Sequence, residues 1–177
     1  MTTLLKVEKI TKKFGDFYAN DQISFDVKKS EVLAILGENG AGKTTLMNIL
    51  FGHYTPDSGN VSFEGNAIAF GNTNNAIKLG IGMVHQHFML AKNLTVLENI
   101  ILGIDRPSLK NLGLKKYKKS IQEVMSTYSL DIDLDMFVEE LSVGEKQRVE
   151  IIKVLFRGAK ILILDEPTAV LVPQEVN

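Results

Sequence analysis

The stretch Gly-Glu-Asn-Gly-Ala-Gly-Lys-Thr-Thr at residues 37–45 constrains this chain more than any other. It fits the pattern G-x-x-x-x-G-K-[ST], with Gly37, Gly42, Lys43 and Thr44 at the defining positions. An unbroken apolar run at 32–36 precedes it, as expected of a buried strand, and 45–51 continues as a helix. Strand, glycine-rich loop and helix are the setting in which this motif cradles phosphates. The sequence therefore predicts a nucleoside triphosphate site.

The loop residues have distinct predicted roles. The glycines let backbone N–H groups turn inward around a phosphate chain, and the helix directs its positive end at the same anion. Lys43 is expected to reach the β- and γ-phosphates and to assist catalysis, and the Thr44 hydroxyl to ligate Mg²⁺. The predicted phosphate-binding set is Gly37, Asn39, Gly40, Ala41, Gly42, Lys43, Thr44 and Thr45.

Composition narrows the class of protein. The 177 residues favour one domain, and the 45% hydrophobic content is that of a globular chain. The absence of cysteine excludes disulfides, zinc–thiolate sites and cysteine nucleophiles. A net charge of −1 gives no general argument for nucleic acid as partner. No apolar run approaches the ~18 residues of a membrane span, and the N-terminus lacks a signal-peptide layout. We therefore expect a cytosolic chain, or a subunit docked on another protein.

A second motif is the apolar strand 161–164 followed by Asp165 and Glu166. The carboxyl end of a strand is where ligands bind in open α/β sheets. Asp165 is predicted to hold Mg²⁺, directly or through water, and Glu166 to act as general base on the attacking water. Alone this pattern is weak, but downstream of a phosphate loop it is a strong signal.

A polar break follows the apolar strand 81–84 and contains Gln86 between His85 and His87. A glutamine amide can ligate Mg²⁺ and can hydrogen-bond a water, which are the two roles predicted for Gln86. The two histidines lack a visible third ligand, so we do not interpret them as a metal site.

A third motif is Leu141–Gln147. Its Ser142 is positioned to cap a helix that has Gly144 in its first turn. Such a helix start suits an anion, although an ordinary capped helix would have the same sequence. Since the chain already has one phosphate loop, one economical arrangement is a head-to-tail pair of domains in which each lends this helix to the other's nucleotide.

The remaining pattern predicts an α/β fold. Alternation predicts strands at 4–10 and 23–27 with a loop at 12–18, and short strands at 60–63 and 67–70 follow a turn at 56–59. Helices are expected to begin after Asn72 or Thr73, after Thr95 and after Ser142, and an amphipathic helix covers 114–128. The lysines of that helix, 115, 116, 118 and 119, are read as its solvated face, with a basic contact surface as the alternative.

The order of these motifs resembles the nucleotide-binding domain of ATP-binding cassette (ABC) proteins, over essentially the whole chain. The resemblance implies a P-loop NTPase fold: a mostly parallel sheet core with an N-terminal antiparallel β subdomain, in which 1–87 and 142–177 form the ATP-binding core of a single domain and 88–141 a helical subdomain. It implies ATP and Mg²⁺ as cofactors, adenine stacking on Phe14, and phosphate binding by Ser142 and Gly144 in trans. The groove near 86–90 would contact membrane-spanning subunits.

A finer resemblance rests on 82–90, 141–144, 165–171 and 173–175, which are similar to the ATPases of importers for nucleosides and simple sugars. The run His85–Leu90 is most similar to the nucleoside branch that works with basic-membrane-protein-type lipoproteins. This implies an incomplete N-terminal cassette of a two-cassette ATPase, peripheral on the cytoplasmic face of the membrane. The implied partners are a second cassette, permease subunits and, indirectly, a substrate-binding lipoprotein, with no nucleic acid.

Some positions depart from the family pattern. Val143 and Glu145 replace a glycine and a glutamine of the usual Leu-Ser-Gly-Gly-Gln, and Val172 stands where many cassettes have aspartate. None of the three histidines occupies the place of the family's switch histidine, so we expect the chain to bind ATP better than it hydrolyses it. The alternatives are a soluble ABC-type ATPase serving translation or DNA maintenance, and a nucleotide-binding module without catalysis.

Overall fold

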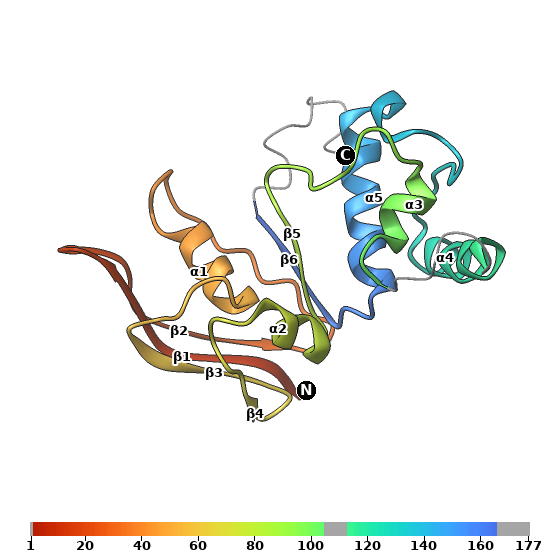
Figure 1. Ribbon diagram of the computed structural model, residues 1–177. Coiled ribbons are helices and arrows are strands. Elements are labelled where there is room, and N and C mark those ends of the chain that lie inside the picture. The colour runs from red at the N-terminus through yellow and green to blue at the C-terminus, as the bar shows by residue number, and fades with distance from the viewer. Residues whose placement is uncertain (1, 105–112, 166–177) are drawn as a thin grey trace. The chain divides into compact units, whose positions relative to one another are not determined.

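The computed structural model describes residues 2–104 and 113–165 (Figure 1). The chain divides into two compact units, residues 1–81 and 82–177, and each is described here by itself. No helix in the described ranges has the length and apolar character needed to cross a membrane.

The first unit is built on a four-stranded antiparallel sheet in the order β2-β1-β3-β4. Its strands are β1 (Thr3–Phe14), β2 (Phe17–Lys28), β3 (Ser58–Phe63) and β4 (Asn66–Ala67). Alternation in β1 buries Leu5 and Val7 and leaves Lys6 and Glu8 on the polar face, as a sheet packed on one side requires.

The hairpin between β1 and β2 overturns one prediction. The expected loop at 12–18 is wrong, because the strands continue to Phe14 and resume at Phe17, and Lys13 pairs with Tyr18. Only Gly15 and Asp16 form the turn, with Gly15 at φ 60°. Ladder hydrogen bonds and the glycine turn thus outweigh the polar composition that suggested a loop.

Two helices belong to the first unit. Helix α1 (Lys43–Phe51) buries Leu46, Ile49 and Leu50, and α2 (Thr73–Leu79) contacts α1. Helix α2 has Asn72 as its N-cap, since the Asn75 N–H donates to the Asn72 side chain at 3.1 Å. The structure thus decides between the two caps that the sequence allowed.

The predicted buried strand at 32–36 is not formed. These residues have no strand pairing in the described part of the chain, and Val32 and Leu36 are 96% and 91% exposed. A strand needs a neighbour to satisfy its backbone groups, whereas β1 to β4 pair with one another and the two later strands pair together. An apolar run therefore indicated a candidate strand without supplying its partner.

The second unit contains a two-stranded sheet of β5 (Ile81–Val84) and β6 (Ile161–Leu164), with Ile81 at the unit boundary. Its helices are α3 (Val96–Ile101), α4 (Leu114–Tyr128), the 3₁₀ turn η1 (Val138–Glu140) and α5 (Val143–Phe156). Helices α3 and α4 both contact α5 (Figure 1). They enclose one apolar cluster: Val96, Leu97, Ile100, Ile121, Met125, Ile132, Leu134, Val138, Leu141, Val149 and Ile152.

Local sequence signals explain the start of α3 and the orientation of α4. The helix begins after Thr95 as predicted, and Thr95 and Glu98 form a capping box there: the Glu98 N–H donates to Thr95 Oγ1 at 3.2 Å, and the Thr95 N–H donates to the Glu98 carboxylate at 2.8 Å. Helix α4 buries Ile121 and Met125, as its periodicity predicts. The division of the chain into an ATP-binding core and a helical subdomain at 88–141 stays a prediction.

Candidate functional site

The phosphate-loop motif forms an exposed turn that leads directly into α1. The Lys43 ammonium donates to the carbonyl oxygens of Gly37 and Glu38 at 2.8 and 2.9 Å, which folds its side chain back over the loop. Helix α1 begins at Lys43, and its N-cap Gly42 has no side chain to cap it, as is typical of a helix start that binds an anion. The loop thus presents a cation and a helix N-terminus on adjacent residues.

Gly42 shapes this loop by its backbone and by the absence of a side chain. Its φ is 85°, and a Cβ at this position would lie 1.9 Å from the carbonyl oxygen of Ala19. The buried Asn20 side chain donates to the Gly42 carbonyl at 3.1 Å. Its other amide atom, Oδ1, is buried without a hydrogen-bond partner in the described part of the chain. Asn20 therefore joins β2 to the loop, a contact that sequence reasoning missed because nothing in the local pattern marks it.

Phe14 lies at the end of the β1–β2 hairpin and is 48% exposed. Its ring and the Tyr54 ring form a T-shaped pair, with centroids 6.0 Å apart and an interplanar angle of 76°, and the Lys12 ammonium lies over the Phe14 ring, 5.6 Å from its centroid. The half-exposed Phe14 ring is therefore held by an aromatic neighbour and a cation while part of its surface stays open to solvent. Tyr54 was missed by the sequence analysis, because its contact with Phe14 joins positions 40 residues apart.

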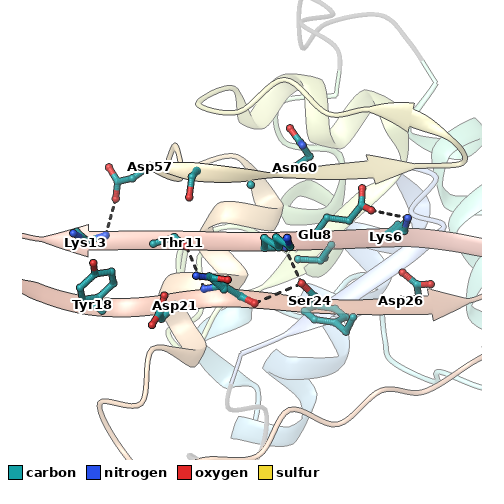
Figure 2. Close-up of a pocket in the computed structure, with 16 residues that line it drawn as sticks. Lys6, Glu8, Thr11, Lys13, Tyr18, Asp21, Ser24, Asp26, Asp57 and Asn60 are labelled. Atoms are coloured by element: carbon teal, nitrogen blue, oxygen red, sulfur yellow. Dashed lines mark hydrogen bonds and ion pairs between the residues drawn. The ribbon is translucent and has the colours of Figure 1, made fainter.

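A large hollow in the first unit lies away from these residues. Its volume is about 1190 Å³, and it follows the polar face of β1, β2 and β3 (Figure 2). Two of its carboxylates are already bound: Glu8 pairs with Lys6 at 2.6 Å, and Asp57 accepts from the main-chain N–H of Lys13 at 2.6 Å, which lowers the pKa of the Asp57 carboxyl below its usual value. None of the described residues that line it belongs to the phosphate loop. We interpret it as the solvated outer face of the sheet.

In the second unit, two predicted metal-binding residues, Gln86 and Asp165, lie just beyond the carboxyl ends of strands β5 and β6. The Asp165 N–H donates to the Val84 carbonyl at 3.2 Å, which places the end of β6 beside the end of β5. Asp165 is only 6% exposed, whereas Gln86, two residues beyond β5, is exposed. Carboxylate and amide oxygens are the ligands that Mg²⁺ prefers, so the donor set at this edge fits the metal. The predicted base Glu166 lies outside the described residues, as does Val172.

Ser142 caps α5 as predicted, and the cap is reciprocal. The Glu145 N–H donates to Ser142 Oγ at 3.3 Å, and the Ser142 N–H donates to the Glu145 carboxylate at 2.8 Å. That backbone hydrogen bond is the main reason why the pKa of Glu145 lies below its usual value. Gly144 lies in the same first turn. Glu145, which stands where the family pattern has glutamine, thus places a carboxylate at the helix start that the resemblance predicts to bind a nucleotide phosphate.

The predicted site residues therefore divide between the units. Phe14 and the loop 37–45 belong to the first unit, and Gln86, Asp165, Ser142 and Gly144 belong to the second. Within the second unit, the pairing of β5 with β6 brings Gln86 and Asp165 to the same sheet edge. The roles assigned to all of these side chains remain predictions.

Comparison with known proteins identifies the family. The family model described as "ABC transporter" matches residues 20–169. The chain is 52% identical, over 99% of its length, to the nucleoside import ATP-binding protein NupA of Lactococcus lactis subsp. cremoris, and it spans 35% of that relative.

Two solved structures show the same fold. An ATP-binding cassette of an ABC transporter in its ADP conformation matches with a TM-score of 0.85 at 30% identity, over 99% of this chain and 73% of the other. A dimeric cassette bound to ADP and Pi matches with a TM-score of 0.76 at 27% identity, over 97% and 78%. The predicted fold class is confirmed, and from the motifs, the fold and these matches together we conclude that the chain belongs to the ATP-binding cassette (ABC) transporter family.

Proposed function

We propose that this chain forms an ATP-binding cassette of the ATPase subunit of an importer for nucleosides or simple sugars. The observation that carries the proposal is the phosphate loop, in which Lys43, the left-handed Gly42 and the uncapped start of α1 converge on adjacent residues. The 52% identity to a nucleoside import ATP-binding protein supports the nucleoside class of cargo.

ATP is the proposed substrate of this site. The ammonium of Lys43 and the first N–H groups of α1 bind the triphosphate, because both present positive charge to the phosphate oxygens. The half-exposed ring of Phe14 stacks on the adenine ring, and its T-shaped contact with Tyr54 holds the Phe14 ring in orientation.

Thr44, Gln86 and Asp165 are the proposed Mg²⁺ ligands, and the ion, when bound, neutralises charge on the β- and γ-phosphates. Gln86 orients the attacking water, and Glu166 accepts its proton as general base. Ser142 and Gly144 contact the nucleotide of a second cassette, an arrangement supported by the dimeric form of a structurally similar cassette. Hydrolysis then reopens the pair, and a membrane permease converts that movement into transport.

Replacing Lys43 with alanine tests the phosphate site. We expect affinity for ATP to fall about 100-fold, because hydrogen bonds to charged groups contribute roughly 1.5–3 kcal/mol each and every ~1.4 kcal/mol is a factor of ten. Titration with a fluorescent ATP analogue measures it. Lys29→Ala, an exposed lysine in a turn, is the control and should bind normally. Equal affinity in the Lys43 variant would remove the phosphate role of this loop.

The cargo class has a separate test in cells. Deleting the gene is expected to abolish uptake of radiolabelled nucleosides, and the wild-type gene, but not the Lys43→Ala gene, should restore it. Sugar uptake measured in the same strains assigns the alternative cargo. Normal uptake of both after deletion would contradict the importer role while leaving ATP binding untouched.

A further inference from the structure

The segment that follows β5 and carries Gln86 is clamped through a single residue, Met89. The Met89 N–H donates to the Glu150 carboxylate at 2.6 Å, and the Met89 carbonyl accepts from the Lys153 ammonium at 3.0 Å. Glu150 and Lys153 lie one turn apart on α5 and pair with each other at 3.4 Å. Two charged side chains of one helix thus bind both main-chain groups of one residue 61 and 64 positions away.

This clamp does not serve the packing of the Met89 side chain, which is 67% exposed. The two side chains that bind the Met89 main chain are, by contrast, shielded from solvent: Glu150 is buried, and the Lys153 side chain is nearly buried. Burying charged groups is costly unless each is paired and hydrogen-bonded. The hydrogen bonds to Met89 and the ion pair between Glu150 and Lys153 meet that requirement. The segment around Met89 therefore helps to keep both charged side chains in place.

The clamp connects two parts of the proposed catalytic machinery. Gln86 lies three residues before Met89 in irregular backbone, and Ser142 caps the same helix that carries Glu150 two turns later. A second anchor lies just beyond, where the Ala91 N–H donates to Asn99 at 2.8 Å and the Asn99 amide donates to the Ala91 carbonyl at 3.0 Å. Of these anchors, only the one at Met89 comes from α5.

We propose that the Glu150–Lys153 pair is a positioning device that fixes the Gln86 segment to α5, so that Gln86 and the Ser142 helix start move as one body. The inference rests on the proposed function, because it assigns the pair to the place where Gln86 acts on Mg²⁺ and water. Neither residue touches the nucleotide; both act through the main chain of Met89.

Arg157 provides a matched control. It lies at the C-terminal end of α5, and its guanidinium donates to the Leu102 carbonyl at 2.7 Å. It therefore makes the same kind of side-chain-to-main-chain contact from the same helix, but to the end of α3 and not to the Gln86 segment. Arg157→Ala should therefore reproduce any general effect of losing such a contact from α5, but it should leave the position of Gln86 unchanged.

Hydrogen exchange on the full-length protein, without nucleotide, tests the clamp directly. Glu150→Ala should speed exchange at the Met89 amide about tenfold or more, since that N–H loses a charge-assisted acceptor. Glu150→Gln, which keeps an acceptor oxygen, should restore most of the protection, and Arg157→Ala should not change it. Fast exchange of Met89 in the unmodified protein, or equal acceleration in the Arg157 variant, would overturn the proposal.

Kinetics then test whether the clamp acts through Gln86. Glu150→Ala and Lys153→Met should each lower kcat about tenfold, as outer-shell partners of ligands do, with little change in ATP affinity. In a Gln86→Ala background the same changes should have no further effect. Additive losses, or a lower kcat in Arg157→Ala of equal size, would overturn the positioning role. Normal turnover of Gln86→Ala alone would instead refute the function proposed for Gln86.

Discussion

Gly42→Ala is expected to destabilise the first unit by about 2–5 kcal/mol and to abolish nucleotide binding. The left-handed backbone alone costs about 1–2 kcal/mol for a residue with a side chain. The new Cβ would also lie 1.9 Å from the Ala19 carbonyl oxygen and 3.0 Å from the Asn20 amide nitrogen, and overpacking typically costs about 1–3 kcal/mol. Since Ala19 belongs to β2, the sheet and the loop cannot both keep their positions.

Gly40→Ala is the matched control for that change. Gly40 has nearly the same backbone, with φ at 82°, but its Cβ would have no atom within 4 Å among the described residues. Only the conformational cost of about 1–2 kcal/mol remains. Thermal unfolding of the full-length variants, with binding of a fluorescent ATP analogue, measures both. Equal losses in the two variants would show that the close approach of Gly42 to Ala19 contributes nothing.

Glu166→Gln is expected to reduce ATP hydrolysis by roughly 10²–10⁴-fold in the complete assembly, the range that general-base catalysis supplies. Glutamine has nearly the shape of glutamate but cannot accept a proton from the attacking water. ATP affinity should stay within a factor of two or three, because the base acts after the nucleotide is bound. Phosphate release at saturating ATP and a binding titration separate the two effects.

Glu139→Gln makes the same chemical change at an exposed position of η1 and should leave turnover unaltered. Unchanged phosphate release in Glu166→Gln would eliminate this residue as the base and would leave the role of Asp165 untouched. A parallel loss of ATP affinity would assign Glu166 to binding instead of proton transfer.

Local signals in the sequence predicted elements whose stabilising contacts lie close along the chain. The capping boxes of Thr95 and Ser142 connect residues three positions apart. The residue types at these positions are therefore enough to locate the starts of α3 and α5. The period of α4 likewise indicates its buried face. The phosphate loop belongs to the same class, because Lys43 reaches carbonyls only five and six residues away.

Predictions failed or were absent where the stabilising partner is distant in sequence. The run at 32–36 is apolar enough for a buried strand, but pairing is a property of two segments, and the described chain supplies no neighbour for it. The polar residues 12–18 look like a loop until Lys13 pairs with Tyr18. The contacts of Asn20, Tyr54 and Glu150 with the candidate site could not be predicted, because no pattern among neighbouring residues marks them.

The sequence by itself determined the chemistry available to this protein: a phosphate loop, a strand ending in carboxylates and a helix capped by Ser142, in an order typical of one family. It could do so because each motif is short and its geometry follows from neighbouring residues. Only the tertiary structure decided which distant groups support that chemistry. It placed Asp165 beside the end of β5, Ala19 against Gly42, and Glu150 with Lys153 on Met89. Contacts of this kind depend on how strands and helices pair in space, which residue spacing along the chain does not encode.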